Sequence, residues 1–388
     1  MSLGQKWKAE ATFYKDPDTG VDMIRFTSYK GNHGHLYFTN PGWYDNGKKI
    51  VFTGDRDNRA NLFSLDLETY EITQITDLEE YPLPYEHVLY TTAVDPIRNR
   101  AYLAYGRDIV SVDLMTYEMK TLYTIPEGFC KHVVSCGEDA DYVYTSIYQD
   151  FSDRFPIDIE RGYIGFKEIF LNKPESHIVQ IRTDGTGYKI IRTENCWIGH
   201  VNASPKRDTL ISFCHEGPWD LVDHRIWTMD TETGEVWKLR PAAPGERIGH
   251  EYWHDDGIHI GYHGQARDGI NKFFGCLRYD GTEATEVAFN FHTGHIHSQD
   301  SSLIVGDGNS EGKYIRLWKW DGEKYIGPKA LCGHFSTFKT QRDHAHPRFS
   351  PDGKYVIFAS DIKGYTSMYY AKVPDFDSLP DVTEFVEK

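Results

Sequence analysis

The stretch WTMDTETGEVWKLR, residues 227–240, reads as two short strands joined by a turn. Alternating apolar residues before Asp230 are typical of a half-buried β-strand, and Asp and Gly are favoured in the turn that follows. The same landmark, an apolar or aromatic strand ending in Asp before a turn, recurs along the chain. Its seven copies end at Asp66, Asp113, Asp184, Asp230, Asp280, Asp321 and Asp375.

The spacing of these aspartates indicates a repeat architecture. Successive spacings are 47, 71, 46, 50, 41 and 54 residues, and repeats of about 40 to 50 residues are typical of propeller blades. Upstream of each Asp, a turn leads into another alternating strand, as in DNGKKIVFTG (45–54) and SPDGKYVIFAS (350–360). A further strand follows each turn, so every repeat predicts four short strands.

Four-stranded units of this kind bury both faces when they pack radially and leave only short edges. The sequence therefore predicts an all-β fold, a seven-bladed β-propeller of four-stranded blades that takes residues 1–388 as a single domain. The strand-like segment 21–28 precedes the first complete repeat and could close the last blade. The one long step marks an insertion at about 149–174, which could be a lid or a decoration.

Composition narrows the classes of function. The 388 residues hold 42 Lys and Arg against 58 Asp and Glu, a net charge of −16, which disfavours a nucleic-acid partner. No run approaches the roughly 18 to 20 apolar residues of a membrane span, and residues 1–16 lack the apolar region of a secretory signal. Six scattered cysteines without a CxxC pair favour free thiols over disulfides, hence a cytoplasmic location. The oligomeric state is left open.

Histidines occupy equivalent positions in the repeats. One lies near the start of the predicted first strand in every repeat: His35, His87, His132, His200, His250, His295 and His346. A lone histidine is usually a core residue bonded to a carbonyl, but seven matched positions weaken that interpretation. Imidazole is the commonest protein ligand of transition metals and the usual base near neutral pH, so the ring of histidines predicts a metal or catalytic site.

Two of these histidines have a second histidine two residues away: His295 with His297, and His346 with His344. Side chains at positions i and i+2 of a strand share one face. Because Pro347 favours an extended backbone at the residue before it, we expect an extended His346 that reaches one ion together with His344.

Gln341 adds an amide oxygen three residues before His344. Three imidazoles and one amide oxygen, without thiolate, suit Mn²⁺, Fe²⁺ or Zn²⁺ better than a structural zinc site built on cysteine. In the fourth repeat, Arg225 lies where a guanidinium could grip a carboxylate bidentately. The alternative for Arg225 is a structural ion pair with Asp220 or Asp223.

The sequence resembles the oligogalacturonate lyases of pectin degradation, essentially from end to end. The resemblance rests on VDMIRFTSYKGNHGHLYFTNPGWYDNGKKIVFTGDR (21–56), RIGHEYWHDDG (247–257), FHTGHIHSQD (291–300) and QRDHAHPRFSPDGKYVIFASD (341–361). It implies a seven-bladed propeller and a Mn²⁺-type ion held by three His and one Gln.

In this sequence the implied metal ligands are Gln341, His344, His346 and a third histidine, His295 in preference to His297. The resemblance further implies His250 as catalytic base and Arg225 as the substrate-binding arginine; His200 of the histidine ring is a further candidate for substrate binding. The expected reaction is metal-dependent β-elimination of short oligogalacturonates, namely digalacturonate and its unsaturated form, to 5-keto-4-deoxyuronate. Abstraction of a weakly acidic C5 proton needs a neutral base and charge stabilisation, which histidines, a divalent ion and an arginine can supply.

Two other functions compete with this expectation. A metal-dependent hydrolase or isomerase could use the same scaffold, since histidine-rich metal sites also activate water. A non-catalytic propeller that binds proteins would make the histidines merely structural.

Overall fold

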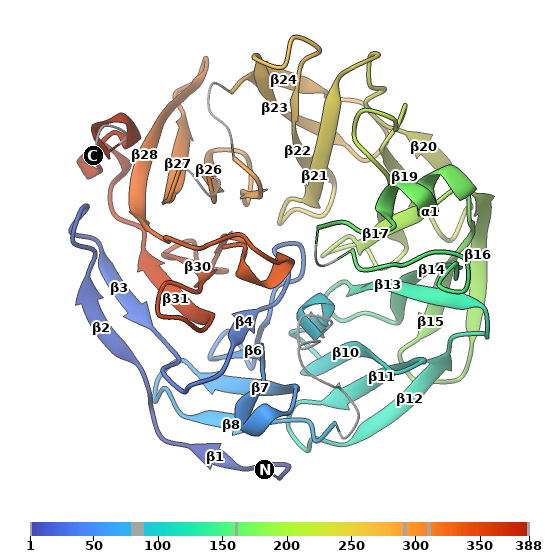
Figure 1. Ribbon diagram of the computed structural model, residues 1–388, viewed down its shortest axis with the longest axis horizontal. Helices are drawn as coiled ribbons and strands as arrows, with labels where there is room; N and C mark the ends of the chain where they lie inside the picture. The colour runs from blue at the N-terminus through green and yellow to red at the C-terminus, as the bar shows by residue number, and fades with distance from the viewer. Residues whose placement is uncertain (1, 79–88, 160–161, 290–292, 309–311, 386–388) are drawn as a thin grey trace. The chain divides into compact units, whose positions relative to one another are not determined.

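The computed structural model describes residues 2–78, 89–159, 162–289, 293–308 and 312–385 (Figure 1). Within these ranges the chain forms seven antiparallel sheets, a single α-helix, α1 (Phe166–Asn172), and short 3₁₀ turns. The predicted fold class, an all-β seven-bladed propeller, is confirmed. Five sheets have four strands and two have more. None of the helices in the described ranges has the length and apolar character needed to cross a membrane.

The chain divides into two compact units. The first combines residues 1–90 and 287–388, and the second comprises residues 91–286. The assignment of residues 1–388 to one domain stays a prediction, and each unit is described below by itself.

The second unit contains four sheets, each built from four strands that follow one another in the chain. Their strands are β9 (Ala93–Asp95), β10 (Arg100–Tyr105), β11 (Asp108–Asp113) and β12 (Met119–Thr124); β13 (Phe129–Cys136), β14 (Tyr142–Gln149), β15 (Glu175–Arg182) and β16 (Tyr188–Asn195); β17 (Ile198–Ala203), β18 (Leu210–His215), β19 (Ile226–Asp230) and β20 (Val236–Lys238); and β21 (Arg247–Trp253), β22 (His259–Gln265), β23 (Lys272–Arg278) and β24 (Thr285–Ala288).

The first unit contains three sheets. One has the order β1–β8–β7–β6–β4, with β5 also paired to β6; one is β25–β26–β27–β28; and one has the order β2–β3–β31–β30–β29. The bounds are β1 (Lys6–Trp7), β2 (Thr12–Lys15), β3 (Asp22–Arg25), β4 (His33–His35), β5 (Trp43–Tyr44), β6 (Lys49–Gly54), β7 (Asn61–Asp66), β8 (Ile72–Gln74), β25 (Ile296–His297), β26 (Leu303–Gly306), β27 (Tyr314–Trp320), β28 (Tyr325–Gly333), β29 (Arg348–Phe349), β30 (Tyr355–Ser360) and β31 (Ser367–Lys372).

The N-terminal segment contributes to the sheet that holds the C-terminal repeat. β3, inside the segment 21–28, pairs antiparallel with β31, with Met23 opposite Ala371. β2 then extends the same sheet by pairing with β3. The last sheet of the chain is therefore completed by strands from its beginning.

The recurring aspartates cap the turns after the third strand of the sheets. Asp66 Oδ1 accepts hydrogen bonds from the backbone N–H groups of Glu68 and Thr69, and Asp230 Oδ1 does the same two and three residues further on. This Asx-turn satisfies backbone donors that the strand leaves unpaired. A local hydrogen bond thus explains why the repeat is visible in the sequence.

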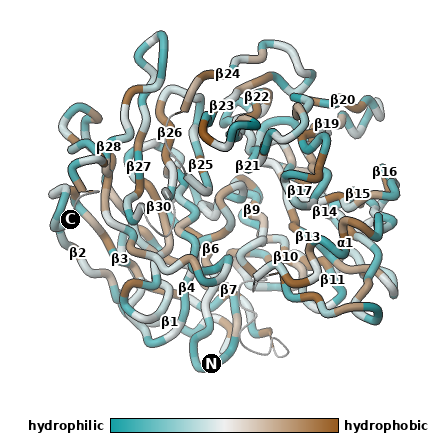
Figure 2. The backbone as a smooth tube through the Cα atoms, turned by 45° about the horizontal axis from the view of Figure 1, so that its top comes forward, coloured by the Kyte–Doolittle hydropathy of each residue, from teal (hydrophilic) through white to brown (hydrophobic). Residues whose placement is uncertain are grey.

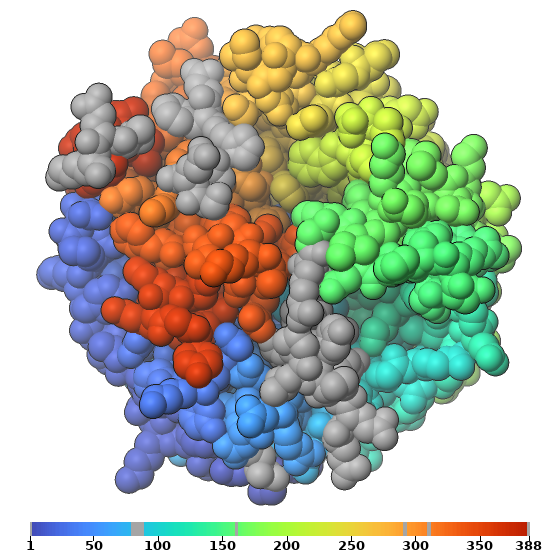
Figure 3. All heavy atoms as spheres, viewed as in Figure 1, coloured from blue at the N-terminus to red at the C-terminus, as the bar shows by residue number. Residues whose placement is uncertain are grey.

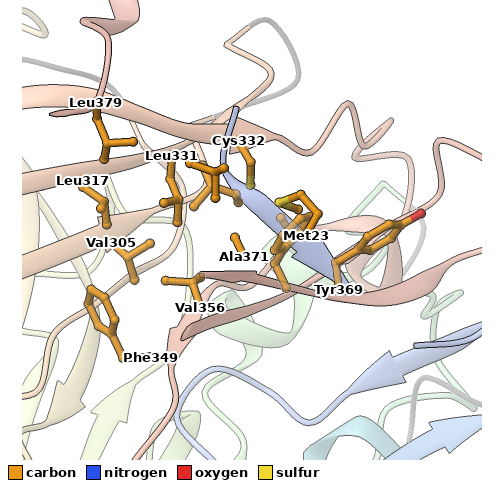
Figure 4. Close-up of a cluster of buried hydrophobic side chains, with 14 of the residues drawn as sticks. Met23, Val305, Leu317, Leu331, Cys332, Phe349, Val356, Tyr369, Ala371 and Leu379 are labelled. Atoms are coloured by element: carbon orange, nitrogen blue, oxygen red, sulfur yellow. The ribbon is translucent and has the colours of Figure 1, made fainter. Parts of the chain in front are cut away.

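Apolar side chains from adjacent strands form the core of each unit. In the first unit, Val305, Leu317, Val356 and Ala371 belong to one buried cluster (Figure 4). Along the chain, hydrophobic colour follows strands such as β19 and β23, whereas many connecting loops are hydrophilic (Figure 2). Burial of these side chains is the main favourable contribution to folding.

The predicted insertion lies between β14 and β15 and contains α1. Its atoms, green in Figure 3, lie at the surface of the face shown. Phe166 of α1 packs edge-on against Trp197, with ring centroids 5.0 Å apart, and Phe170 lies so close to Gly217 that a Cβ there would meet its ring at 2.4 Å. The insertion is thus anchored by its own small aromatic core.

Candidate metal centre and catalytic residues

Three histidines of the first unit converge in the structure. His295, His344 and His346 each offer one ring nitrogen, and the three nitrogens lie within 4.8 Å of one another. The ring centroids of His295 and His346 are 4.1 Å apart. The structure places His295, and not His297, in this group; His297 packs against Phe349 instead.

Asp307 orients the first of these imidazoles. It follows β26 and is fully buried, and its carboxylate accepts hydrogen bonds from the backbone N–H of His295 at 2.9 Å and pairs with Nδ1 of His295 at 2.8 Å. Burial raises the pKa of Asp307, but the His295 imidazole outweighs that effect and leaves the pKa below its usual value. A carboxylate paired with Nδ1 fixes the orientation of the ring, as is common for histidines that bind a metal. The sequence analysis missed Asp307, whose only signal was its place after the strand LIVG.

The backbone at His346 contradicts the expected extended conformation. Its φ is +48°, in the left-handed region, although Pro347 follows it, whereas His344 is extended with φ −72° and ψ 145°. Buried Ala345 separates the two, and its carbonyl accepts hydrogen bonds from Ala359 N and pairs with Nε2 of His35. These fixed contacts hold the strained residue, so the two imidazoles meet through a bend rather than along one face of a strand.

Aromatic rings enclose the three histidines. Tyr37 and Tyr90 pack on His346 with centroids 5.1 and 6.0 Å away, and Phe338 packs on His344 at 4.7 Å. Burial, together with the neighbouring His295, lowers the pKa of His344 to about 4. Its Nδ1 is buried and finds no hydrogen-bond partner among the described residues. A neutral imidazole with an unused nitrogen is what a divalent transition metal requires, so the residues fit such an ion.

Gln341 begins the 3₁₀ turn η3 (Gln341–Asp343), which leads directly into His344. It is half-buried, and its carbonyl accepts a hydrogen bond from His344 N at 3.3 Å. Its role as the fourth ligand stays a prediction.

The second unit holds a separate charged network around Arg225. The guanidinium donates from Nη1 to Glu216 at 3.0 Å and from Nε to Glu251 at 3.1 Å. The alternative partners Asp220 and Asp223 were therefore wrong, because the carboxylates that face Arg225 come from the strand end of β18 and from β21. Burial raises the pKa of Glu216, but Arg225 and then His200 outweigh it and keep that pKa well below its usual range.

His200 joins this network from β17. Its Nε2 lies 3.1 Å from Glu216, and its backbone N–H donates to Nδ1 of His132 at 3.3 Å. Burial, followed by the nearby His200, lowers the pKa of His132 to about 3. His132, His200 and Glu216 form another group whose geometry could hold an ion.

His250 contacts a histidine of the adjacent strand. Its Nδ1 is 2.8 Å from Nε2 of His263, and Trp219 packs edge-on against it at 5.1 Å. His263 was not singled out from the sequence, because its alternating strand YHGQ gives no catalytic signal. The pairing comes only from the register, which sets Gly249 opposite His263.

A bulge presents the histidines of the second unit. The register shifts at His132, His200 and His250 in β13, β17 and β21, and both His200 and His250 have positive φ. Each of the last two follows a glycine that must stay small: a Cβ on Gly199 would meet Glu216 Oε2 at 3.0 Å, and one on Gly249 would meet Trp219 at 2.4 Å. Bulges redirect a side chain out of the ladder. The Gly-His pair in the sequence therefore indicates a bulge that redirects the histidine side chain.

His35 is buried and pairs with the Ala345 carbonyl at 3.3 Å, so its role is structural support of the His344–His346 loop. His87 lies outside the described residues.

The seven sheets and the three converging histidines define a β-propeller with a candidate metal centre. The chain belongs to the oligogalacturonate lyase family, because the model of that family, described as oligogalacturonate lyase, matches residues 1–316. The predicted family and the predicted lyase class are confirmed. The matched residues end before Gln341, so the ligand roles near the C-terminus rest on the geometry above.

Relatives extend the similarity over nearly the whole chain. An oligogalacturonide lyase of Pectobacterium atrosepticum and an oligogalacturonate lyase of Dickeya dadantii are each 27% identical, covering 97% of this chain and 99% of their own. A solved oligogalacturonate lyase in complex with manganese has a TM-score of 0.85 at 26% identity, over 97% of this chain and 99% of its own. One from Vibrio parahaemolyticus has a TM-score of 0.84 at 25% identity, over 96% and 99%.

Proposed function

We propose that the protein cleaves short oligogalacturonates, digalacturonate and its unsaturated form, by metal-dependent β-elimination to 5-keto-4-deoxyuronate. The observation that carries this proposal is the convergence of His295, His344 and His346 in a member of the oligogalacturonate lyase family. A similar structure is that of an oligogalacturonate lyase in complex with manganese. The proposed cofactor is therefore Mn²⁺, held by the three histidines and Gln341.

The donor set suits this ion, because neutral imidazoles and an amide oxygen are borderline-to-hard ligands. When bound, a divalent ion supplies Lewis-acid stabilisation of the charge that develops at the uronate carboxylate. Asp307 supports the set by fixing the orientation and tautomer of His295. Tyr37, Phe38 and Tyr90 restrict water around the imidazoles, which strengthens electrostatic interactions there.

His250 is the proposed base that takes the C5 proton. Its hydrogen bond with His263 decides which tautomer is competent: when His250 donates from Nδ1 to His263 Nε2, Nε2 of His250 carries the lone pair that accepts a proton. His263 is in that case a positioning residue. The positive charge formed on His250 is shared with a second imidazole, which lowers the cost of protonation.

Arg225 is the proposed carboxylate-binding group. Nη1 and Nε are held by Glu216 and Glu251, and Nη2 makes no hydrogen bond within the described part of the chain. The two glutamates fix the plane of the guanidinium before substrate arrives, so a substrate carboxylate meets a rigid donor. His200, paired to Glu216, is proposed to contribute a further polar contact to the sugar.

The cellular location and the partner of the protein are also proposals. All six cysteines are free, which supports a reducing compartment such as the cytoplasm. The proposed partner is a short anionic oligogalacturonide, and the net charge of −16 supports a small substrate met by local cations rather than a nucleic acid. The oligomeric state and the preferred chain length of the substrate stay open.

Product analysis tests the proposal. Incubation of Mn²⁺-loaded protein with digalacturonate should give galacturonate and 5-keto-4-deoxyuronate, identified by mass spectrometry and by a carbonyl-specific assay. Hydrolysis would give two galacturonates and isomerisation an intact dimer. Either product pattern, or no product with stoichiometric metal bound, would refute β-elimination.

A further inference from the structure

A cavity of about 420 Å³ lies in the first unit, and none of the residues that line it is used in the proposed reaction. It is formed by the edge strand β2, its neighbour β3, the end of β28 and the β30–β31 hairpin. Its lining includes Tyr14, Arg25, Phe335, Phe358, Lys363 and Tyr369. This volume falls within the range of small-molecule sites, which are mostly apolar with a few polar groups that fix the ligand.

The cavity gathers positive charge in an acidic protein. Arg25 and Lys363 both line it, and neither has a carboxylate within ion-pair distance among the described residues. Arg25 Nε is buried and has no hydrogen-bond partner there. A buried guanidinium donor without a partner is costly unless a ligand or water satisfies it.

Tyr369 adds a second buried donor. Its side chain is 3% exposed, and its hydroxyl lacks a hydrogen-bond partner of acceptable geometry in the described ranges. Burial raises the pKa of this hydroxyl, and the charge of Arg25 and its side-chain contact with the hydroxyl oppose that effect, so the two groups lie close together. Figure 4 shows Tyr369 at the border of the apolar cluster with its hydroxyl pointing away from it.

The carboxylate in the lining, that of Asp16, is already engaged. Oδ1 accepts hydrogen bonds from Asp18 N and Thr19 N, and Oδ2 accepts one from Gly333 N at 2.9 Å. It therefore fixes the loop that carries the cavity wall and leaves the cationic groups to face a ligand. The polar side of the cavity thus favours an anion.

Aromatic rings form another part of the lining. Phe358 stacks on Tyr369 with centroids 5.3 Å apart and planes at 15°, and Phe335 closes the end of β28. Gly333 permits this arrangement, since a Cβ there would lie 2.1 Å from the Phe335 ring. Such a wall packs against the flat or apolar face of an organic ring and offers nothing to a bare inorganic anion.

We propose that this cavity is a second binding site, for a small organic carboxylate whose anionic group is held by Arg25, Lys363 and the Tyr369 hydroxyl. Its ring or apolar face packs on Phe358. A planar carboxylate matches the donor fork of one arginine better than a point charge would. The site does not depend on the proposed lyase reaction.

Titration calorimetry on the full-length protein tests the proposal. D-galacturonate and benzoate are titrated in the presence of EDTA, which removes binding that depends on a metal. We expect at least one of them to bind. Arg25→Met should weaken that binding at least tenfold, and Tyr369→Phe, which removes one hydrogen bond, by about three- to tenfold. Lys363→Ala should also weaken that binding. Because Lys363 is exposed, this variant still tests the site if Arg25→Met fails to fold.

Matched variants serve as controls. Arg59→Met removes a partly exposed arginine of the first unit that pairs with Asp77 outside the cavity, and Tyr123→Phe removes another buried, unpartnered hydroxyl in the second unit. Both should bind like the unmodified protein. Unchanged affinity in Arg25→Met and Lys363→Ala would overturn the site, as would the absence of heat with both carboxylates. If inorganic phosphate displaced the bound carboxylate equally well, the proposal that the ligand is an organic carboxylate would be wrong.

Discussion

Nδ1 of His250 lies 2.8 Å from Nε2 of His263, and the two rings are nearly parallel with planes 13° apart. The two residues come from adjacent strands, β21 and β22. The pair forms a hydrogen bond between two imidazoles, and the direction of that bond decides which nitrogen of His250 carries the proton.

Replacing His263 by Ala should lower kcat by about tenfold to a hundredfold, since the competent tautomer of His250 is no longer selected. Metal content and melting temperature should change little. The pH profile of kcat should shift as well, which a merely structural role of His263 would not cause. The control is His259→Ala on the same strand, whose imidazole pairs with Asp256; that variant should keep the normal profile.

His250→Ala should keep the metal and lose turnover by about 10²- to 10⁴-fold, the usual contribution of a general base. Elemental analysis and steady-state kinetics on the same preparation check both parts. If the variant loses its metal, His250 is a ligand and not the base.

His344→Ala should lose tight metal binding and activity together while remaining folded, because it removes one imidazole from a loop. His297→Ala is the informative comparison, because His297 lies only two residues from His295 in sequence but packs on Phe349. The His297→Ala variant should have a lower melting temperature and still bind one ion. Calorimetric metal titration and circular dichroism distinguish the two, and retention of tight metal in His344→Ala would remove it from the ligand set.

Arg225→Lys should reduce kcat/KM at least tenfold, measured well below the melting temperature, since a lysine cannot keep the planar donor fork. Stability should fall too, because Glu216 or Glu251 loses its partner. Arg240→Lys is a matched control: Arg240 also bridges two glutamates, Glu246 and Glu286. It should lower the melting temperature alone. Normal kinetics in Arg225→Lys would exclude that residue from substrate binding.

The metal-free protein should lose stability as pH falls from about 6.5 towards about 4. Burial lowers the pKa of His35 and of His344 to about 4 in the folded state, so between that value and 6.5 the unfolded chain binds more protons. The linkage is about 1.4 kcal/mol per pKa unit for each group. Thermal unfolding at pH 7.5, 6.5, 5.5 and 4.5 measures it. A melting temperature that stays constant over this interval would contradict neutral burial of these imidazoles.

Interactions between residues close in sequence explain why much of the fold could be predicted from the sequence. Asp66 and Asp230 each bond backbone groups two and three residues away, so the turn signal and the residues that satisfy it sit in one short segment. The proximity of His344 and His346 could be predicted for the same reason, but the backbone conformation of His346 could not. A left-handed residue before Pro347 is locally unfavourable, and contacts of Ala345 with β30 and His35 hold it in place.

The seven repeats, the turn aspartates and the group of histidines could be predicted from the sequence, because periodicity and short-range hydrogen bonds act within a few residues. The partners of the site residues could be found only in the folded chain: Asp307 for His295, His263 for His250, and Glu216 with Glu251 for Arg225. These pairs depend on strand register and on bulges that redirect single side chains. Burial then removes water from them, and their charges and tautomers become fixed by neighbours distant in the chain.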